Sequence, residues 1–374
     1  MDISNKVKFD RNIPFNELPD LPPHEKIIDH EILKKWGLAS RALAELNRNI
    51  LHIPNPSMLV NTISLQEAQS STAIENIFTT EDELYKALSD TVKEAAANPA
   101  TKEVLRYREA LWGGYKTLAK KKTFDTSTFV KVFRQIKNTK EGIRPAHSQV
   151  IIKRGQSKIK PGEVIYTPPR GKVIVEKKLN NLLDFLNNEK FEIDPLLKMA
   201  IAHYQFEAIH PFTDGNGRTG RIINLLYLVN QNLLSHPVLY LSKYIINNKE
   251  EYYHLLSGVT QRQAWKPWIL FMLSAVENTA KHTNQTIDEI LSQMNATHKH
   301  ANKKLKWYSL ELNQLLFSQP YIKQKEVGKL LGVKSRTTLT KYMYELWKLG
   351  ILAPHAEGRE VYYFNTDLIR ILQP

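Results

Sequence analysis

The sequence predicts a mainly α-helical protein with one short β-hairpin near its middle and a small mixed module at its C-terminal end. Three observations lead to this fold class. Apolar residues recur at helical spacing over most of the 374 residues, β-branched runs are confined to two places, and a basic segment closes the chain. With 42% hydrophobic and 24% charged residues, the composition is that of a folded chain and not of a disordered one.

Composition also limits the chemistry. The chain has no cysteine, which excludes disulfides, thiol nucleophiles and cysteine-bound zinc, so a metal would need oxygen or histidine ligands and Mg²⁺ is favoured. No apolar run approaches the roughly 18 residues of a membrane span, and the start has no signal-peptide core, so we expect a cytoplasmic protein without membrane contact. The net charge of +14 favours polyanionic partners such as nucleotides or nucleic acid, although a diffuse basic excess can also serve solubility alone.

The elements follow in order. The first 25 residues are rich in proline and predict an extended arm. Two β-branched runs, 149–152 and 164–167, predict a hairpin or flap with Gly155, Pro161 and Gly162 between them. Apolar periodicity predicts helices over 30–50, 65–77, 80–89, 101–119, 175–187, 195–209, 217–232, 249–256 and 265–282.

These elements suggest four parts. An N-terminal helical region (1–100) precedes a helical core with its flap (101–282), and a polar helical linker (283–304) leads to a C-terminal module (305–374). In that module, two helices around a turn at Gly332, with Ser335 as a cap, and two β-like runs predict a winged helix-turn-helix with its wing tip at Gly358 and Arg359.

Residues 301–374 carry twelve basic and six acidic side chains, a net +6. The second helix would present Arg336, Thr337, Thr338 and Lys341 to a DNA groove or to phosphates. Winged helices also act as protein-docking or dimerisation modules. DNA and a second copy of this chain are therefore both candidate partners.

The segment 210–221, HPFTDGNGRTGR, joins two of the predicted helices. Gly215 and Gly217 flank Asn216, so the backbone can curl and point several N–H groups inward at the start of the next helix. Such a nest binds phosphate. The formal GxGxxG pattern follows a helix instead of a strand and has no acidic residue about 20 positions later, so a dinucleotide-binding unit is a poor fit.

Around this nest the side chains suit the parts of a nucleotide. Arg218 and Arg221 can pair with phosphate oxygens, and Asp214 can hold a Mg²⁺ that bridges phosphates. His210 remains free as a base that can take a proton from an incoming hydroxyl. The segment therefore predicts nucleotide-dependent transfer to a hydroxyl.

These residues resemble the Fic motif, HPFx(D/E)GNGRxxR, and every specified position is met; the resemblance extends over about residues 60–280. It implies a helical Fic core with a flap and a protein adenylyltransferase, which moves AMP from ATP to a protein hydroxyl and releases pyrophosphate. The resemblance assigns His210 as the base and Asp214 as the Mg²⁺ ligand. Nucleotide binding would fall to Gly215, Asn216, Gly217, Arg218, Thr219, Gly220 and Arg221.

Two further segments fit the same family. The flap residues Val150, Ile151, Ile152 and Lys153, following Gln149, would pair with a target segment as an added strand. Tyr252 and Tyr253 match a tyrosine pair near the adenine, although ordinary core packing would explain them equally well.

Ser71, Glu75 and Asn76 resemble the Fic inhibitory motif (S/T)xxxE(G/N), carried by a helix before the core (about 64–77). A carboxylate opposite Arg221 would occupy the guanidinium that should hold the γ-phosphate. The sequence thus predicts a self-restrained adenylyltransferase that uses ATP and Mg²⁺. The alternatives are a DNA-binding transcriptional regulator whose Fic core only senses nucleotide, and removal of AMP at the same site.

Overall fold

The computed structural model describes residues 9–24, 27–51, 53, 56–89, 95–153, 162–357 and 360–372. In this part of the chain, helices dominate and two small antiparallel sheets are present. The helices are α1 (His30–Leu51), α2 (Pro56–Ile74), α3 (Glu81–Ser89), α5 (Pro99–Lys121), α6 (Thr126–Lys137), α7 (Lys172–Asn187), α8 (Pro195–Ile209), α9 (Asn216–Asn230), α10 (Leu241–Asn247), α11 (Lys249–Arg262), α12 (Trp265–Lys304), α13 (Leu310–Leu316), α14 (Gln324–Leu331), α15 (Arg336–Lys348) and α16 (Thr366–Leu372), with a 3₁₀ turn at Glu189–Phe191.

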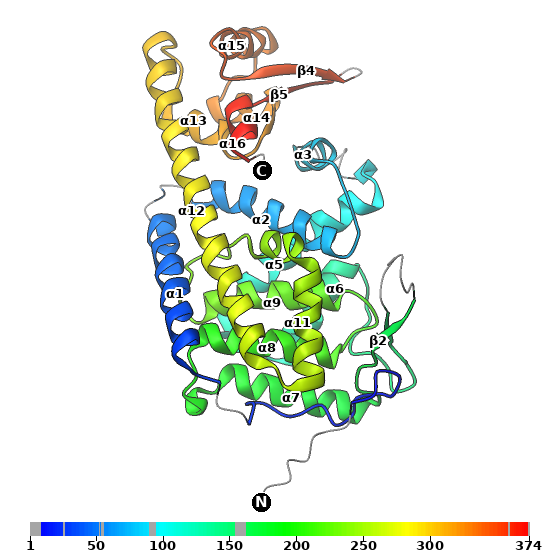
Figure 1. Ribbon diagram of the computed structural model, residues 1–374. Helices are drawn as coiled ribbons and strands as arrows, with labels where there is room; N and C mark the ends of the chain where they lie inside the picture. Colours follow the sequence, from blue (N-terminus) through cyan, green and yellow to red (C-terminus); the bar gives the residue numbers. More distant parts are fainter. Residues whose placement is uncertain are drawn as a thin grey trace, which may run out of the picture.

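Helices α8 and α9 form the centre of the molecule (Figure 1). Almost every side chain of α8 is buried, because α7, α9 and α12 pack around it. Such a helix is not amphipathic, because it has no polar face, and its stability comes from burial of apolar side chains on all sides. Asp194 caps its N-terminus by accepting a hydrogen bond from the Leu196 N–H at 2.8 Å. The loop that joins this rigid pair is the HPFTDGNGRTGR segment.

Helix α12 is the longest element and runs from the core to the C-terminal module (Figure 1). α1 packs along it, and its buried residues continue past the middle of the helix with Ile287, Ile290 and Met294. The sequence divided this stretch into a core helix ending at 282 and a linker over 283–304. Both lie in one unbroken helix, because the apolar stripe continues across residue 282.

The C-terminal module combines short helices with one small antiparallel sheet. Its elements follow in the order α13, β3 (Tyr321–Lys323), α14, α15, β4 (Ala353–Glu357), β5 (Glu360–Phe364) and α16. The three strands form a sheet in the order β3-β5-β4. Gly332 ends α14 in the left-handed conformation with φ of 66°, and Ser335 caps α15 by accepting from the Thr338 N–H. Both features agree with the sequence prediction, while the expected wing tip at 358–359 lies outside the described residues.

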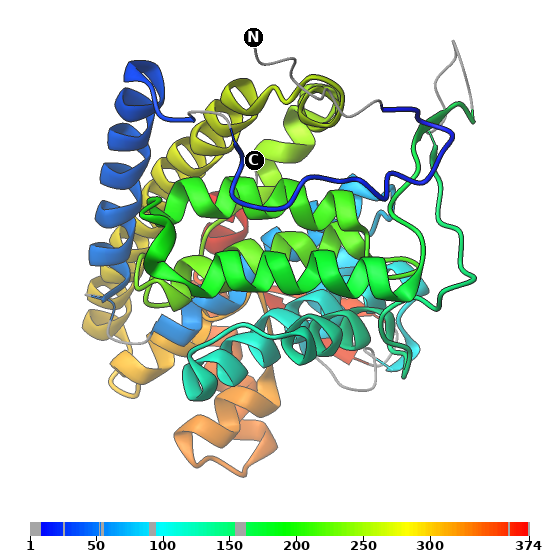
Figure 2. The same cartoon turned by 90° about the horizontal axis from the view of Figure 1, so that it is seen from below.

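The flap is shorter than the sequence suggested. Only β1 (Ile152–Lys153) and β2 (Val164–Tyr166) pair, whereas Val150 and Ile151 form no ladder. Gly155 and Pro161, expected in its turn, lie outside the described residues. The N-terminal arm runs beneath the core to the base of the flap (Figure 2).

Two other sequence expectations need correction. The inhibitory helix was expected to reach Ile77, but α2 ends at Ile74, and Glu75 and Asn76 lie in the turn that follows. Asn76 takes a left-handed φ of 61°, which asparagine tolerates better than most residues and which ends the helix. Helices α6 and α10 were not predicted. Within the described residues, no helix is both long enough and apolar enough to cross a bilayer.

Candidate active site

The loop after α8 has a fixed shape because its ends and its middle are tied down. His210 adopts a left-handed φ of 50° and Pro211 follows, so the helix cannot continue. The side-chain amide of Asn216 spans the loop: its Oδ1 accepts from the Phe212 N–H, and its Nδ2 donates to the Phe212 carbonyl, both at 2.9 Å. Gly215, at φ of 73°, then opens α9. The asparagine therefore shapes the turn, and the N-terminus of α9 is left facing the site.

His210 lies partly buried at the start of this loop. Its Nδ1 is 3.3 Å from the Glu207 carbonyl, and Arg144 donates from Nε to the His210 carbonyl at 2.8 Å. Arg144 also donates to the carbonyls of Ile209 and Pro169, so a single buried guanidinium joins the end of α8 to the loop that follows β2. Burial lowers the pKa of His210 to about 4, which leaves the imidazole neutral and able to accept a proton.

Arg221, on the second turn of α9, is held by the segment that ends α2. Its Nε donates to Ser71 Oγ, and its Nη2 donates to the Ser71 carbonyl and to Glu75 Oε1, each at 2.8 Å. Arg221 is buried. Burial alone raises the pKa of Glu75, but the charge and hydrogen bond of Arg221 outweigh it, so the pKa lies below its usual value. The pair is therefore ionised, and the Nε and Nη2 groups of the guanidinium are both engaged.

Glu75 also covers the nest itself. A Cβ atom built on Gly217 would collide with Glu75 Oε1 and crowd Arg221 Nη1. A carboxylate oxygen thus rests directly on the first turn of α9, where the backbone N–H groups and the helix dipole favour a negative group. Glu75 therefore occupies the space over this turn in this structure.

The outer edge of the loop carries a second set of charges. Asp214 protrudes into solvent, with Oδ2 at 2.7 Å from Lys137 Nζ and Oδ1 at 3.5 Å from Arg218 Nη2. Arg218 is 2% exposed and pairs through Nη1 with Glu103 of α5. Burial lowers the pKa of Arg218 to about 10, so it keeps its charge at neutral pH.

The remaining motif residues support the packing of α8 against α9. Thr219 donates from Oγ1 to the Gly215 carbonyl at 2.8 Å, which closes the first turn of α9. Gly220 lies against Glu207 and Phe206, where a Cβ atom would collide with Glu207 Oε1. That buried oxygen has no hydrogen-bond partner among the described residues, and burial raises the pKa of Glu207 to about 8.

A metal ion would find few protein ligands here. Among the described residues, no group of three or more His, Asp or Glu side chains is arranged to hold one. Asp214 presents an exposed carboxylate at the loop, and a second exposed carboxylate, Glu141, accepts a hydrogen bond from Thr213 Oγ1 at 3.3 Å. This donor set fits Mg²⁺ that takes most of its oxygens from a nucleotide and from water, which is how Mg²⁺ commonly binds at phosphate sites.

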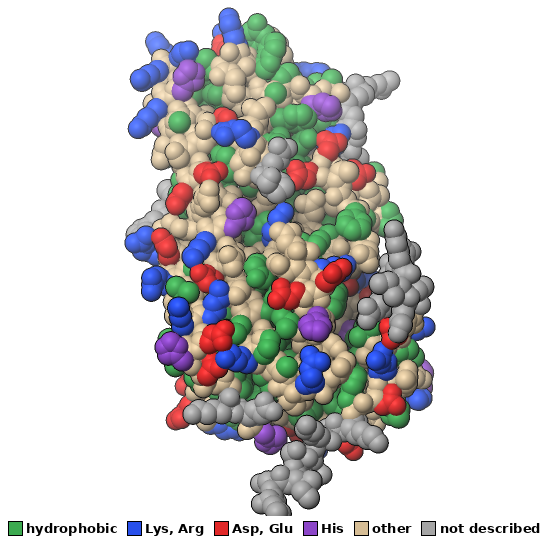
Figure 3. Space-filling view, viewed as in Figure 1, with side chains coloured by type: hydrophobic (Ala, Val, Ile, Leu, Met, Phe, Trp, Pro, Cys, Tyr) green, Lys and Arg blue, Asp and Glu red, His purple; other side chains and the backbone are tan. Residues whose placement is uncertain are grey.

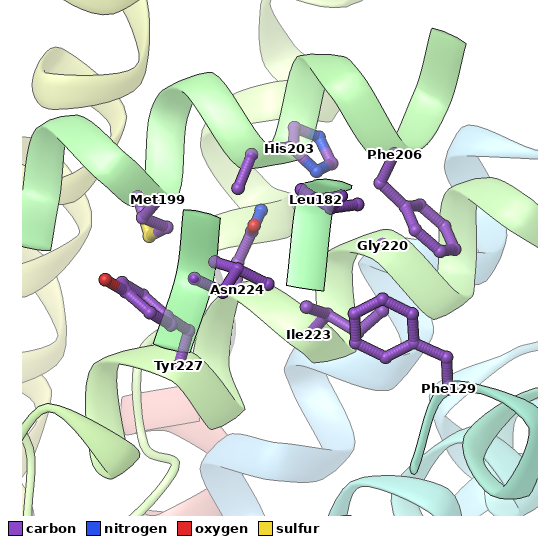
Figure 4. Close-up of a pocket in the computed structure, with 11 residues that line it drawn as sticks. Phe129, Leu182, Met199, His203, Phe206, Gly220, Ile223, Asn224 and Tyr227 are labelled. Atoms are coloured by element: carbon purple, nitrogen blue, oxygen red, sulfur yellow. The ribbon is translucent and has the colours of Figure 1, made fainter. Parts of the chain in front are cut away.

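A small internal cavity lies between α8 and α9, behind the loop (Figure 4). His203, Asn224 and Tyr227 line it, and their Nδ1, Nδ2 and hydroxyl groups have no hydrogen-bond partner within the described part of the chain. These three polar atoms, in an otherwise mainly apolar lining, suit an enclosed water molecule. Neither His210 nor Asp214 lines this cavity, so it is separate from the loop site.

The predicted tyrosine pair is divided between core and surface. Tyr252 is 1% exposed and its hydroxyl lies 2.8 Å from His203 Nε2, while Tyr253 is 41% exposed. Lys249 of the same helix donates to Asn76 Oδ1 at 3.1 Å, so α11 lies beside the inhibitory turn. Tyr253 is thus the member of the pair that a ligand could reach.

Sequence reasoning missed Glu103, Lys137 and Arg144. Each comes from outside the motif, on α5, at the end of α6 and after α6, and contacts the loop through a side chain. No motif or local spacing marks them, because only the packing of α5 and α6 against α9 brings them to the loop.

Comparison with protein families agrees with this geometry. Residues 33–116 match the Fic/DOC family N-terminal region, and residues 125–228 match the Fic/DOC family itself. Residues 291–368 match the C-terminal domain described as "Protein adenylyltransferase SoFic-like". The chain belongs to the Fic family.

Similar Fic proteins are known from animals and bacteria. The protein adenylyltransferase fic-1 of Caenorhabditis elegans is 33% identical over 130 residues, which cover 34% of this chain and 23% of that protein. A probable protein adenylyltransferase of Aquifex aeolicus is 30% identical over 171 residues, covering 46% of this chain and 49% of the relative. The chain thus spans half or less of the length of these curated relatives.

Solved structures share the Fic fold over more of the chain. A Fic family protein from Desulfovibrio desulfuricans G20 superposes with a TM-score of 0.57 over 92% of this chain and 98% of that one, at 21% identity. Fic-1 (residues 134–508) from C. elegans superposes with a TM-score of 0.51 over 70% of this chain and 74% of that chain, at 20% identity. At such identities the likeness concerns the fold alone.

Proposed function

We propose that this Fic protein is a protein adenylyltransferase that moves AMP from ATP to a hydroxyl group of a protein, including itself. The observation that carries the proposal is the loop: a neutral imidazole, an anion-accepting helix N-terminus and two buried arginines lie within twelve residues of sequence. In the reaction, the hydroxyl oxygen bonds to the α-phosphorus, the bond from that phosphorus to the bridging oxygen breaks, and pyrophosphate leaves. His210 takes the hydroxyl proton.

The other residues of the site contact different parts of the nucleotide and of the target. The first turn of α9, Gly215 to Gly217, holds phosphate through its N–H groups, and Arg218 and Arg221 balance the remaining charge. Mg²⁺ bound with Asp214 would screen the phosphates and favour departure of pyrophosphate. The flap strand Ile152–Lys153 pairs with the target segment and brings its hydroxyl in line.

We also propose that the contact of Glu75 with Arg221 restrains this activity. The carboxylate occupies both the guanidinium and the first turn of α9, so a triphosphate cannot take the same place until Glu75 leaves. Removing one partner of a buried ion pair of this kind leaves the other charge unpaired, which costs about 3–5 kcal/mol of free energy. The restraint is therefore strong enough to suppress turnover by orders of magnitude.

The test is self-AMPylation with labelled ATP. We expect the Glu75→Gly variant to incorporate far more label than the wild-type protein, and His210→Ala in the same background to incorporate none. Glu45→Gly, which removes an exposed carboxylate on α1, is the matched control and should behave as wild type. Equal labelling of the wild type and Glu75→Gly would contradict the inhibitory role.

Removal of AMP at the same site is a second candidate function. Glu75 faces the loop with an ionised carboxylate, which could orient a water molecule toward an AMP-protein bond. Incubation of an AMPylated protein with Mg²⁺ and no ATP tests this role, and full retention of the label would exclude it.

DNA binding through the C-terminal module is supported by the exposed face of α15. Arg336, Thr337, Thr340 and Lys341 are exposed there, and further Lys and Arg side chains gather where α12 ends (Figure 3). A gel shift at increasing salt tests this partner, because phosphate contacts give affinity that falls steeply with salt. Nucleotide binding without AMP transfer in Glu75→Gly, together with such a shift, would favour a regulator that senses nucleotide.

A further inference from the structure

Four charged side chains form a closed ring beside the loop, with cations and carboxylates in alternation. Lys137 Nζ lies 2.7 Å from Asp214 Oδ2 and 3.5 Å from Glu103 Oε1, and Arg218 pairs with both carboxylates. Two members, Asp214 and Arg218, belong to the motif. The other two come from α5 and α6, and neither has a role in the proposed reaction so far.

Lys137 is held in place by its stem as well as by its charge. It is the last residue of α6, and the next residue, Asn138, ends the helix in the left-handed conformation. A Cβ atom built on Gly215 would lie 3.2 Å from Lys137 Cδ and 3.3 Å from its Cγ, so the aliphatic stem covers the glycine that opens α9. The ammonium group is thereby directed at the carboxylate that the metal requires.

We infer that Lys137 is a positioning residue that competes with the divalent cation for Asp214, and that Glu103 limits this competition. The inference rests on the proposed function and adds to it. In the absence of metal, the ammonium neutralises Asp214 and keeps it beside Arg218. A dication bound to the same carboxylate would be repelled by the ammonium group at short range. The ion pair between Lys137 and Asp214 must therefore break when the metal-nucleotide complex binds.

Glu103 gives the displaced ammonium a second partner. Its carboxylate is only 15% exposed and already lies 3.5 Å from Lys137 Nζ. When a metal takes Asp214, Lys137 can shift toward Glu103 without losing all its charge pairing. Removing Glu103 should therefore fix Lys137 on Asp214 and weaken metal binding, whereas removing the charge of Lys137 should strengthen it.

The experiment measures how much Mn²⁺ improves nucleotide binding. The full chain carries Glu75→Gly so that the nest is open, and the ligand is α,β-methylene-ATP, whose α–β bridge cannot be cleaved. Calorimetric titrations in EDTA and in excess Mn²⁺ give two dissociation constants for this ligand. The ratio of the constant in EDTA to the constant in Mn²⁺ measures how much the metal improves nucleotide binding. This readout requires no turnover.

We expect Lys137→Met, whose side chain still covers Gly215, to raise this ratio about two- to fivefold. Lys137→Arg should restore the parent ratio, and Glu103→Gln should lower it. Lys131→Met, on the exposed side of the same helix, is the control and should leave it unchanged.

A merely structural role of the ring would lower nucleotide affinity in all three ring variants, with and without metal. Nucleotide binding with an unchanged or lowered ratio in Lys137→Met would overturn the inference alone. Absence of nucleotide binding in the parent protein would overturn the proposed function, and this inference with it.

Discussion

The partly buried imidazole of His210 sets the pH range in which the loop holds a free base. Burial lowers its pKa from 6.5 to about 4, the guanidinium of Arg144 acts in the same direction, and Glu75 opposes both. A lowered pKa means that the ring stays neutral down to about pH 5 and gains its proton only below that. In an NMR titration, with His210→Ala used for assignment, we expect the midpoint well below 6. Glu75→Gly should lower the midpoint further, and a value at or above 6.5 would contradict this account.

At the same scale, the sequence predicted what the motif contains and not what packs against it. The pairing of Glu75 with Arg221 follows from charge and family pattern, and the structure bears the contact out at 2.8 Å. Glu103 and Lys137 could not be predicted, because their place at the loop depends on how α5 and α6 pack. The metal and the nucleotide roles of the motif residues remain predictions until they are measured.

Among the elements, the N-terminal arm holds the flap from outside. Phe15 donates its N–H to the Thr167 carbonyl at 3.0 Å, and its buried ring lies 6.3 Å from the ring of Tyr166 on β2. We expect Phe15→Ala to release the arm and to speed amide hydrogen exchange across residues 162–170. Ile13→Ala, which alters an arm side chain that is 60% exposed, should leave exchange there unchanged.

The Phe15→Ala variant also distinguishes an effect on the flap from an effect on nucleotide binding. In the Glu75→Gly background, Phe15→Ala should weaken target modification several-fold and leave nucleotide affinity as it was, because the arm does not touch the loop after α8 through the contacts described. Loss of nucleotide affinity of the same size would mean that the arm supports the whole core and not the flap alone.

Element boundaries were predicted well where one residue ends a helix and poorly where packing decides. Pro195 to Ile209 matches its prediction because Asp194 caps one end and Pro211 follows the other. The unbroken α12 and the early end of α2 were missed. The first depends on burial beyond residue 282, and the second on a left-handed turn at Asn76 that helical periodicity does not report.

At the scale of the whole molecule, the C-terminal module is bonded to the helices that carry the inhibitory turn. Gln66 of α2 donates to the Leu372 carbonyl at 2.8 Å, and the Tyr321 hydroxyl donates to Asp82 of α3 at 2.7 Å. Since α2 ends one residue before Glu75, loosening this junction should ease the release of Glu75 from Arg221. Release of the C-terminal module from α2 and α3 would then be coupled to release of Glu75 from Arg221.

Tyr321→Phe tests this coupling, because it removes the bond to Asp82 and keeps the ring that stacks on Tyr85. A hydrogen bond to a charged group is worth about 1.5–3 kcal/mol, and only part of that reaches Glu75, so we expect basal self-AMPylation to rise about two- to tenfold. The rise should vanish in the Glu75→Gly background, where no restraint is left to relieve. Tyr344→Phe, on the exposed face of α15, should leave self-AMPylation unchanged in both the wild-type and the Glu75→Gly background. A rise of equal size with and without Glu75 would show that Tyr321 acts on the catalytic loop by another route.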